Sequence, residues 1–146
     1  MNASDAVENL LIDHVFRDTQ WTKPAALYIA LCTSAPTDSD TGSTIVEPVG
    51  NNYSRVAYNP SASSNWEATQ GGVSGASSGT GGQTSNNGAI TFAAASGSWG
   101  SITHIAIVSA STAGTMYFWG ELSVAKTITS GDIFSFQANQ LTVTIA

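Results

Sequence analysis

The stretch Trp99-Gly-Ser-Ile-Thr-His-Ile-Ala-Ile107 carries the clearest strand pattern in the chain. Large apolar residues alternate with small or polar ones, and β-branched residues dominate, which is typical of a strand inside a sheet. The period of two places Ile105 and Ile107 toward a core, with Trp99 closing one end. The same period places His104 on the opposite face, together with Ile102. We expect His104 to make a structural hydrogen bond there, toward a second sheet, a loop or a partner.

Further strand patterns follow on both sides of this stretch, separated by turn residues. They cover Ala25–Thr33, Tyr53–Tyr58, Ala89–Ala93, Thr115–Gly120, Glu121–Thr129, Ile133–Phe136 and Leu141–Ile145. Short strands spaced by about 8–12 residues predict a β-sandwich or barrel. The last two segments look like the facing strands of a C-terminal hairpin. We therefore expect an all-β fold, an antiparallel β-sandwich of jelly-roll or Greek-key-like topology, with one short N-terminal α-helix.

The helix is predicted over residues 4–17. Ser4 is a suitable N-cap, and Asp5 and Glu8 suit the positive N-terminal end of the helix dipole. One face is apolar at the spacing of helix turns; its members are Val7, Leu10, Leu11, His14 and Val15. We expect this stripe to pack on a sheet or on a neighbouring subunit, with His14 half-buried.

Residues 59–88 form a tract of Ser, Gly, Asn, Thr and Ala in which Trp66 is the one large anchor. A loop of this length is unusual in a compact domain, so we expect a flexible loop or a segment that orders against a partner. The composition is the same on both sides of the tract. Residues 1–146 are therefore predicted to be a single domain. The rings of residues 117–119 are expected to face the core on one side and to be covered by this loop or by another subunit on the other.

Composition excludes several classes of function. Charged residues make up 10% of the chain, against about 25% in typical soluble domains. A surface poor in Lys and Glu suits protein interfaces. The four cations are scattered and the net charge is −6, so we expect no nucleic-acid binding. We expect no membrane insertion, because no apolar run reaches the ~18 residues that a span requires. The N-terminus has no signal-peptide pattern, so synthesis in a host cytoplasm is expected.

Patterns that could carry chemistry are weak. Gly75-Ala-Ser77-Ser-Gly79 matches a nucleophile motif but lies in the Gly/Ser tract, where a strand before it and a helix after it are missing. Asp38-Ser-Asp40-Thr-Gly42 resembles the start of a calcium loop, but the glycine is one position early and Val49 stands where the bidentate Glu belongs. We interpret it as a turn in which Asp side chains bond the backbone. Cys32 is expected to be a buried, inert thiol. The sequence thus predicts no catalytic residues, no metal site and no cofactor.

Several segments together resemble a family of small virion proteins of tailed bacteriophages. They are Ser96–Ile107, Lys126–Phe136 and Leu141–Ile145, preceded by the apolar strand Leu27–Thr33, the Ala-Pro-Thr-Asp loop at Ala35–Asp38 and the Tyr-Ser-Arg-Val strand at Tyr53–Val56. The resemblance covers nearly the whole chain except the 59–88 tract. It implies a structural role in the virion and supplies no catalytic residues.

Three functions are compatible with the sequence. The first is a non-enzymatic capsid cement or decoration protein that bridges subunits of the major capsid protein, as a homo-oligomer in the particle. The alternative is a tail or tail-fibre component, an adaptor or a tip, in contact with other virion proteins. The third is a carbohydrate-binding module, which would need the rings of Trp66, Trp99 or Trp119 exposed in a row. Partner contacts are predicted in the helix and the Gly/Ser tract, at Leu10, Leu11, Val15, Trp66, Gly71 and Gly82.

Overall fold

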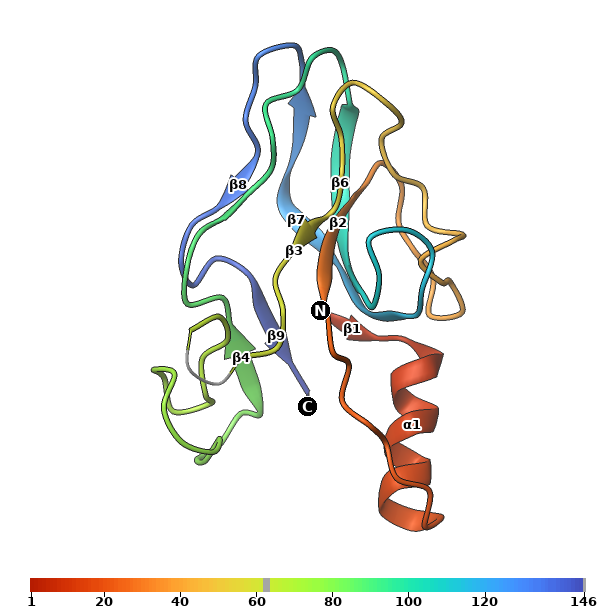
Figure 1. The fold of residues 1–146 in the computed structure, drawn as a ribbon, viewed down its shortest axis with the longest axis vertical. Coiled ribbons are helices and arrows are strands. Elements are labelled where there is room, and N and C mark those ends of the chain that lie inside the picture. Colours follow the sequence, from red (N-terminus) through yellow and green to blue (C-terminus); the bar gives the residue numbers. More distant parts are fainter. Residues whose placement is uncertain (62–63, 146) are drawn as a thin grey trace.

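The computed structural model describes residues 1–61 and 64–145; residues 62, 63 and 146 of the predicted single domain lie outside them. The described residues form one helix and nine strands (Figure 1). In chain order these are β1 (Asn2–Ala3), α1 (Asp5–Phe16), β2 (Tyr28–Cys32), β3 (Val56–Ala57), β4 (Gln83–Ser85), β5 (Ile90–Thr91), β6 (Gly100–Val108), β7 (Met116–Ile128), β8 (Ser135–Phe136) and β9 (Thr142–Thr144). The predicted all-β fold with one short N-terminal helix is confirmed.

The largest sheet has five antiparallel strands in the order β1-β7-β6-β2-β3. Strand β6 lies at its centre and pairs with β2 over the whole length of β2, from Tyr28 opposite Val108 to Cys32 opposite His104. Its other edge pairs with β7. Thr115–Gly120 and Glu121–Thr129 were predicted as two strands, but β7 runs through both as one strand. Its register with β6 shifts twice, between Ile102 and His104 and between Ile107 and Val108.

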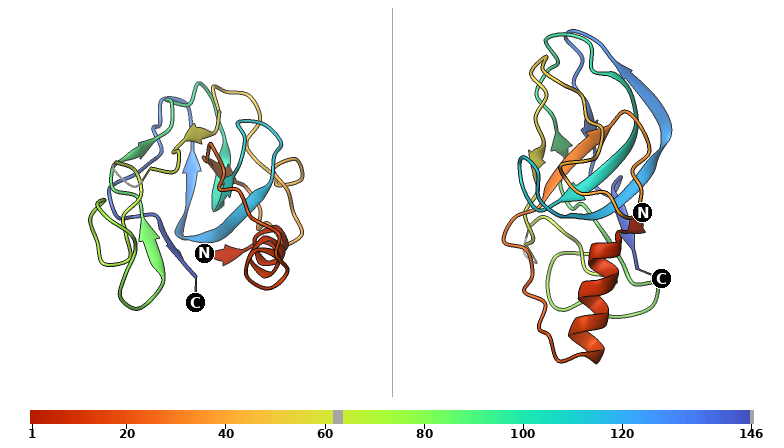
Figure 2. Two further views of the ribbon diagram at one scale, coloured as in Figure 1. Left: turned by 60° about the horizontal axis from the view of Figure 1, so that its bottom comes forward. Right: turned by 90° about the vertical axis from the view of Figure 1, so that its right-hand side faces the viewer.

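A second layer consists of two small antiparallel sheets, β5–β8 and β4–β9. The main core lies between this layer and the five-stranded sheet, as the end-on view in Figure 2 shows. It takes Ile29 and Leu31 from β2, Ile90 from β5, Phe136 from β8 and Val143 from β9, all nearly inaccessible to solvent. A smaller cluster on the opposite face of the large sheet includes Ala30, Ala106 and Val108.

The predicted C-terminal hairpin is wrong. Phe136 in β8 pairs with Ile90 in β5, and Val143 in β9 pairs with Thr84 in β4. Both segments thus find partners far away in sequence, because the chain between residues 82 and 92 runs beside them. The 59–88 tract is also less irregular than predicted, since it contains β4 and an isolated bridge between Trp66 and Asn86.

The prediction for the faces of β6 is half right. Ile105 and Ile107 are buried in the main core with Trp99, as expected. Ile102 was assigned to the face of His104, but it also belongs to the main core. The reason is an irregularity in the pairing with β7, where five residue steps from Lys126 to Glu121 face two steps of β6. Such a bulge breaks the alternation that the sequence pattern assumes.

Helix α1 begins where the capping residue predicts. The Ser4 side chain accepts a hydrogen bond from the Val7 N–H (3.4 Å) and donates one to the Met116 carbonyl (2.6 Å). The helix ends at the C-cap Arg17, which forms an exposed ion pair with Asp13. In the described chain no helix is long and apolar enough to cross a lipid bilayer.

A buried ion pair holds two loops of the large sheet together, the one between β2 and β3 and the one between β6 and β7. The Arg55 side chain, 4% exposed, bonds both carboxylate oxygens of Glu47, with its shortest contact at 2.6 Å. Its remaining donors bond the carbonyls of Gly42, Ala110 and Ala113. The guanidinium therefore has a partner in every direction, which is the condition under which a buried charge is tolerated.

Replacing Arg55 by Met should lower the free energy of unfolding by about 3 kcal/mol, because Glu47, whose side chain is only 17% exposed, would lose its counter-charge. Chemical denaturation measures this change. The matched control is Arg17→Met, which breaks the exposed ion pair with Asp13 and should cost under about 1 kcal/mol. An equal decrease in the free energy of unfolding in both variants would contradict the prediction, because the buried network would then stabilise the fold no more than the exposed ion pair does.

Cys32 and Tyr53 lie beside this network. Cys32 is fully buried, as predicted. Burial raises the pKa of its thiol to about 12, and the negative charge of Glu47 adds to this shift. Burial also raises the pKa of Tyr53, whose hydroxyl donates a 2.6 Å hydrogen bond to Glu47 and accepts one from the Leu31 N–H. Both groups stay protonated at neutral pH.

The Cys32 thiol should therefore be unreactive toward a thiol reagent such as Ellman's reagent in the folded protein and reactive after unfolding. Its pKa is raised above the ordinary value of 9.0. The neutral thiol thus stabilises the fold fully below that pH, and this stabilisation is lost as the pH rises toward about 12. Denaturation of wild type and Cys32→Ala across alkaline pH measures the difference. Rapid labelling of the folded protein at neutral pH would contradict the burial.

Candidate functional site

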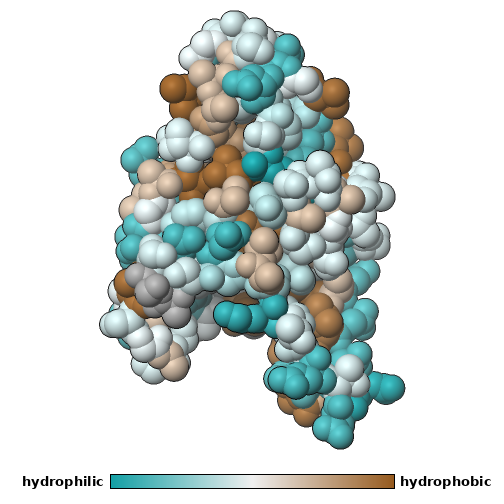
Figure 3. All heavy atoms as spheres, viewed as in Figure 1, coloured by the Kyte–Doolittle hydropathy of each residue, from teal (hydrophilic) through white to brown (hydrophobic). Residues whose placement is uncertain are grey.

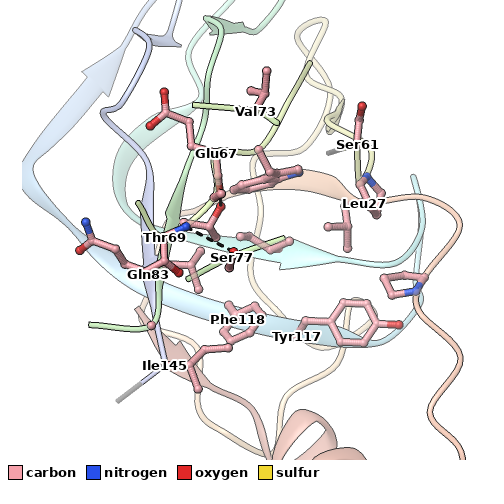
Figure 4. A pocket seen from close by; sticks show the side chains of 18 of the residues that line it. Leu27, Ser61, Glu67, Thr69, Val73, Ser77, Gln83, Tyr117, Phe118 and Ile145 are labelled. Atoms are coloured by element: carbon pink, nitrogen blue, oxygen red, sulfur yellow. Dashed lines mark hydrogen bonds between the residues drawn. The ribbon is translucent and has the colours of Figure 1, made fainter. Parts of the chain in front are cut away.

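An apolar pocket of about 680 Å³ opens beside the N-terminal end of β7. Its opposite wall is formed by residues 67–82, called the wall segment below. Figure 4 shows lining side chains from both sides of the pocket, among them Leu27, Val73, Tyr117, Phe118 and Ile145. The space-filling view in Figure 3 is hollowed in this region, between the lobe that carries β4 and helix α1. The size is that of pockets that bind ligands or side chains.

A β-bulge supplies two of the aromatic rings. Ile107 and Val108 are consecutive in β6, but their partners in β7 are Phe118 and Met116, so Tyr117 is an extra residue. A bulge re-aims side chains that strict alternation would send to opposite faces. Tyr117 and Phe118 therefore both line the pocket. Desolvation raises the pKa of the Tyr117 hydroxyl. The predicted cover of these rings is only partial: the wall segment faces them across a space.

The wall segment is anchored where it meets the second layer. The Glu67 N–H bonds the Ser85 carbonyl (2.9 Å), and the Thr84 hydroxyl bonds the Glu67 carbonyl (2.7 Å). Within the segment, Gln70 closes a loop by donating to the Ala76 carbonyl and accepting from the Ser78 N–H. The wall thus has internal hydrogen bonds of its own, although Gly and Ser dominate its sequence.

Asn86 fixes the chain next to the hydrogen bonds that attach the wall segment to β4. Its side chain is fully buried and has every polar atom paired. The amide donates to the carbonyls of Gly88 (2.7 Å) and Gln137 (2.8 Å), and the oxygen accepts from the Leu141 N–H (2.8 Å). Such a satisfied buried amide fixes one arrangement of the chain around it.

The predicted contact residues of the tract have different roles. Trp66 lines the pocket with part of its ring, while the rest packs edge-on against Tyr58 and the core. Gly82 also lines the pocket; its backbone has a positive φ of 51°, and a Cβ there would lie 2.6 Å from the Ile145 carbonyl oxygen. Gly71 forms a turn with Ala68 and does not line the pocket.

Helix α1 leaves most of its apolar stripe in solvent. Val7 is the one helix residue that is buried, and Leu10 is half-buried. Leu11 and Val15, predicted as contacts, are exposed, and so are Ile12 and Phe16. His14 was expected to be half-buried but is exposed, and its ring accepts a hydrogen bond from the Trp21 N–H. The helix touches its own sheet only near its base, so it cannot bury this stripe itself (Figure 2).

We call Leu11, Ile12, Val15 and Phe16 the helix face. They are 44%, 49%, 57% and 79% exposed. Ile12 and Phe16 were missed in the sequence, although they lie four residues apart beside the pair formed by Leu11 and Val15. The four-residue spacing of Ile12 and Phe16 was the sequence signal that the apolar face of the helix is wider than predicted. The contributions of Val73 and Ile145 to the pocket had no local signal, because they meet only in the folded chain.

The acidic loop forms a turn, as interpreted from the sequence. Asp40 accepts hydrogen bonds from the Thr37 N–H and from the hydroxyls of Thr37 and Thr44. These bonds, led by the one from Thr44, lower the pKa of Asp40. Asp38 accepts a hydrogen bond from the Trp119 indole (2.8 Å). Among the described residues no three His, Cys, Asp or Glu side chains gather as metal ligands.

The other residues with possible chemistry lie apart. Ser77 accepts a hydrogen bond from the Thr69 N–H in the wall segment, with no strand before it and no helix after it. His104 in β6 bonds Thr103, the structural role expected of it. Trp99 is buried and Trp119 is half-buried against Asp38, so the three rings do not form the exposed row that a carbohydrate-binding surface needs.

Comparison with known protein families gives one assignment. The family model described as podophage GP4 fiber I protein gp80 matches residues 2–144. A comparison with curated proteins gives no match. The match includes the 59–88 tract as well as the segments that resemble phage virion proteins. The chain therefore belongs to this family of phage fibre proteins, and its role is that of a structural virion protein.

Proposed function

We propose that the protein is a non-enzymatic component of the podophage tail fibre, held in place by contacts with other virion proteins. The observation that carries this proposal is the family match over residues 2–144, because that family is described as a fibre protein. Capsid cement, the first interpretation of the sequence, has no comparable support. The tail-fibre alternative fits the family better.

The surface supports an assembly role. Few charged side chains are available to keep neighbouring proteins apart, and the helix face leaves four large apolar residues in water. The apolar pocket lies at the same end of the molecule (Figure 3). Exposed apolar surface of this kind marks interaction sites.

An enzyme would instead need a nucleophile, a base and an orienting group brought together. Ser77 and the two histidines lie on separate elements and bond other partners.

The position in the particle can be tested by immunogold labelling of intact virions with an antibody against the folded protein. We expect gold particles at the tail, on the fibres. The matched control is the same virion after its fibres have been removed and with its head intact. It should lose the label. Label spread over the head would overturn the proposal in favour of capsid cement.

A further inference from the structure

We propose that the helix face of one copy of this protein inserts into the apolar pocket of a second copy. Both features are apolar surfaces left open to solvent at one end of the molecule. One projects and the other is hollow. The inference is independent of where the protein lies in the particle, because a head protein could self-associate in the same way.

The chemistry of the pocket selects an apolar occupant. Most of its lining surface is apolar and comes from residues such as Trp66, Phe118 and Ile145 (Figure 4). Polar side chains, among them Glu67, Thr69 and Gln83, line a smaller part of it. A polar ligand would place part of its surface against the apolar walls, and burial of unpaired polar groups is unfavourable. Large aliphatic and aromatic side chains fit the lining, and a volume of about 680 Å³ has room for several of them.

The helix face has the form of such an occupant. Leu11 and Val15 are one helical turn apart, and so are Ile12 and Phe16, so the four side chains make one continuous surface. An amphipathic helix that lays residues at these spacings into a hydrophobic groove is a recurrent mode of recognition. Phe16, the most exposed of the four at 79%, lies at the tip of the helix, where it can reach deepest into a pocket.

One chain cannot make this contact with itself. The Ser4 hydroxyl bonds the Met116 carbonyl, and the backbone N–H groups of Ser4 and Asp5 bond Tyr117 and Asp38, so the base of the helix is fixed. The return segment is held by the bond from the Trp21 N–H to His14 and by the packing of Trp21 on Tyr117. Trp21 lines the pocket, whereas no residue of the helix face does. A second copy supplies the missing partner for both surfaces.

The arrangement also favours a closed assembly. Helix α1 and the lobe of the wall segment point to the same end of the molecule, with the hollow between them (Figures 1 and 3). Two copies that meet end to end can each insert a helix into the other, which is the self-complementary contact of a twofold pair. Such a pair buries both helix faces and both pockets at once.

The test measures the mass of the purified full chain in solution by analytical ultracentrifugation over a range of concentrations. Wild type should associate. Phe16→Asp in the helix face and Val73→Asp in the wall segment should each weaken association by about tenfold or more, since each removes one half of the contact. Val49→Asp is the matched control, because Val49 is 90% exposed and belongs to neither surface. It should associate as wild type does.

Mixing the two variants distinguishes this contact from others. The Phe16→Asp chain keeps an intact pocket and the Val73→Asp chain keeps an intact helix face, so an equimolar mixture should recover one contact per pair. Association of helix with helix would not be rescued by mixing. A mixture of Val15→Cys and Val73→Cys chains should likewise form a disulfide between positions 15 and 73, while Cys32 stays buried. Circular dichroism establishes that each variant is folded.

Wild-type protein that stays monomeric up to millimolar concentration would overturn the proposal, even if the pocket then binds another virion protein or a lipid. So would association that neither variant weakens, or variants that mixing does not rescue. None of these results bears on the fibre assignment, which the labelling of virions tests separately.

Discussion

Burial of β6 on both faces is the constraint on which the rest of the molecule depends. Ile105 and Ile107 face the main core, while Ala106 and Val108 face the smaller cluster on the other side of the sheet. A strand in this position needs a partner along each edge, because its backbone groups cannot reach water. Strands β2 and β7 meet that need. The second layer then packs over the apolar face that these three strands share.

The local features were predictable because their causes are local. Ser4 caps a helix through a hydrogen bond three residues away, and the alternation around Ile105 needs only its own neighbours. Pairing across long distances was not predictable in this way. Phe136 was assigned to a neighbouring strand, but it pairs with Ile90, and the sequence around either residue does not specify that choice. Ile102 was placed on the wrong face because the alternation rule assumes regular pairing, and the pairing with β7 shifts its register between Ile102 and His104.

The candidate site likewise combines features that were predictable from the local sequence with features that depend on contacts between distant residues. Leu11 and Val15 were identified from helix periodicity, and both prove to be exposed apolar residues. Gly71 was chosen with them from composition alone and forms an ordinary turn. The pocket had no signature in the sequence, since Val73, Phe118 and Ile145 come from a loop, strand β7 and the C-terminal segment. A bulge of one residue at Tyr117 decides which rings line it, and no single-sequence pattern marks such a bulge.

The anchoring of the wall segment has a consequence for how this protein can vary. The segment leaves the second layer near Trp66 and returns to it at β4, and Asn86 fixes that junction through bonds to Gly88, Gln137 and Leu141. Between those ends it contributes one wall of the pocket and nothing to the main core. Because loop closure grows slowly in free-energy cost, doubling its length costs only about 0.6 kcal/mol. The shape and chemistry of the pocket can therefore change by insertion and substitution inside the segment, away from its ends at Glu67 and Gly82, which bond the second layer.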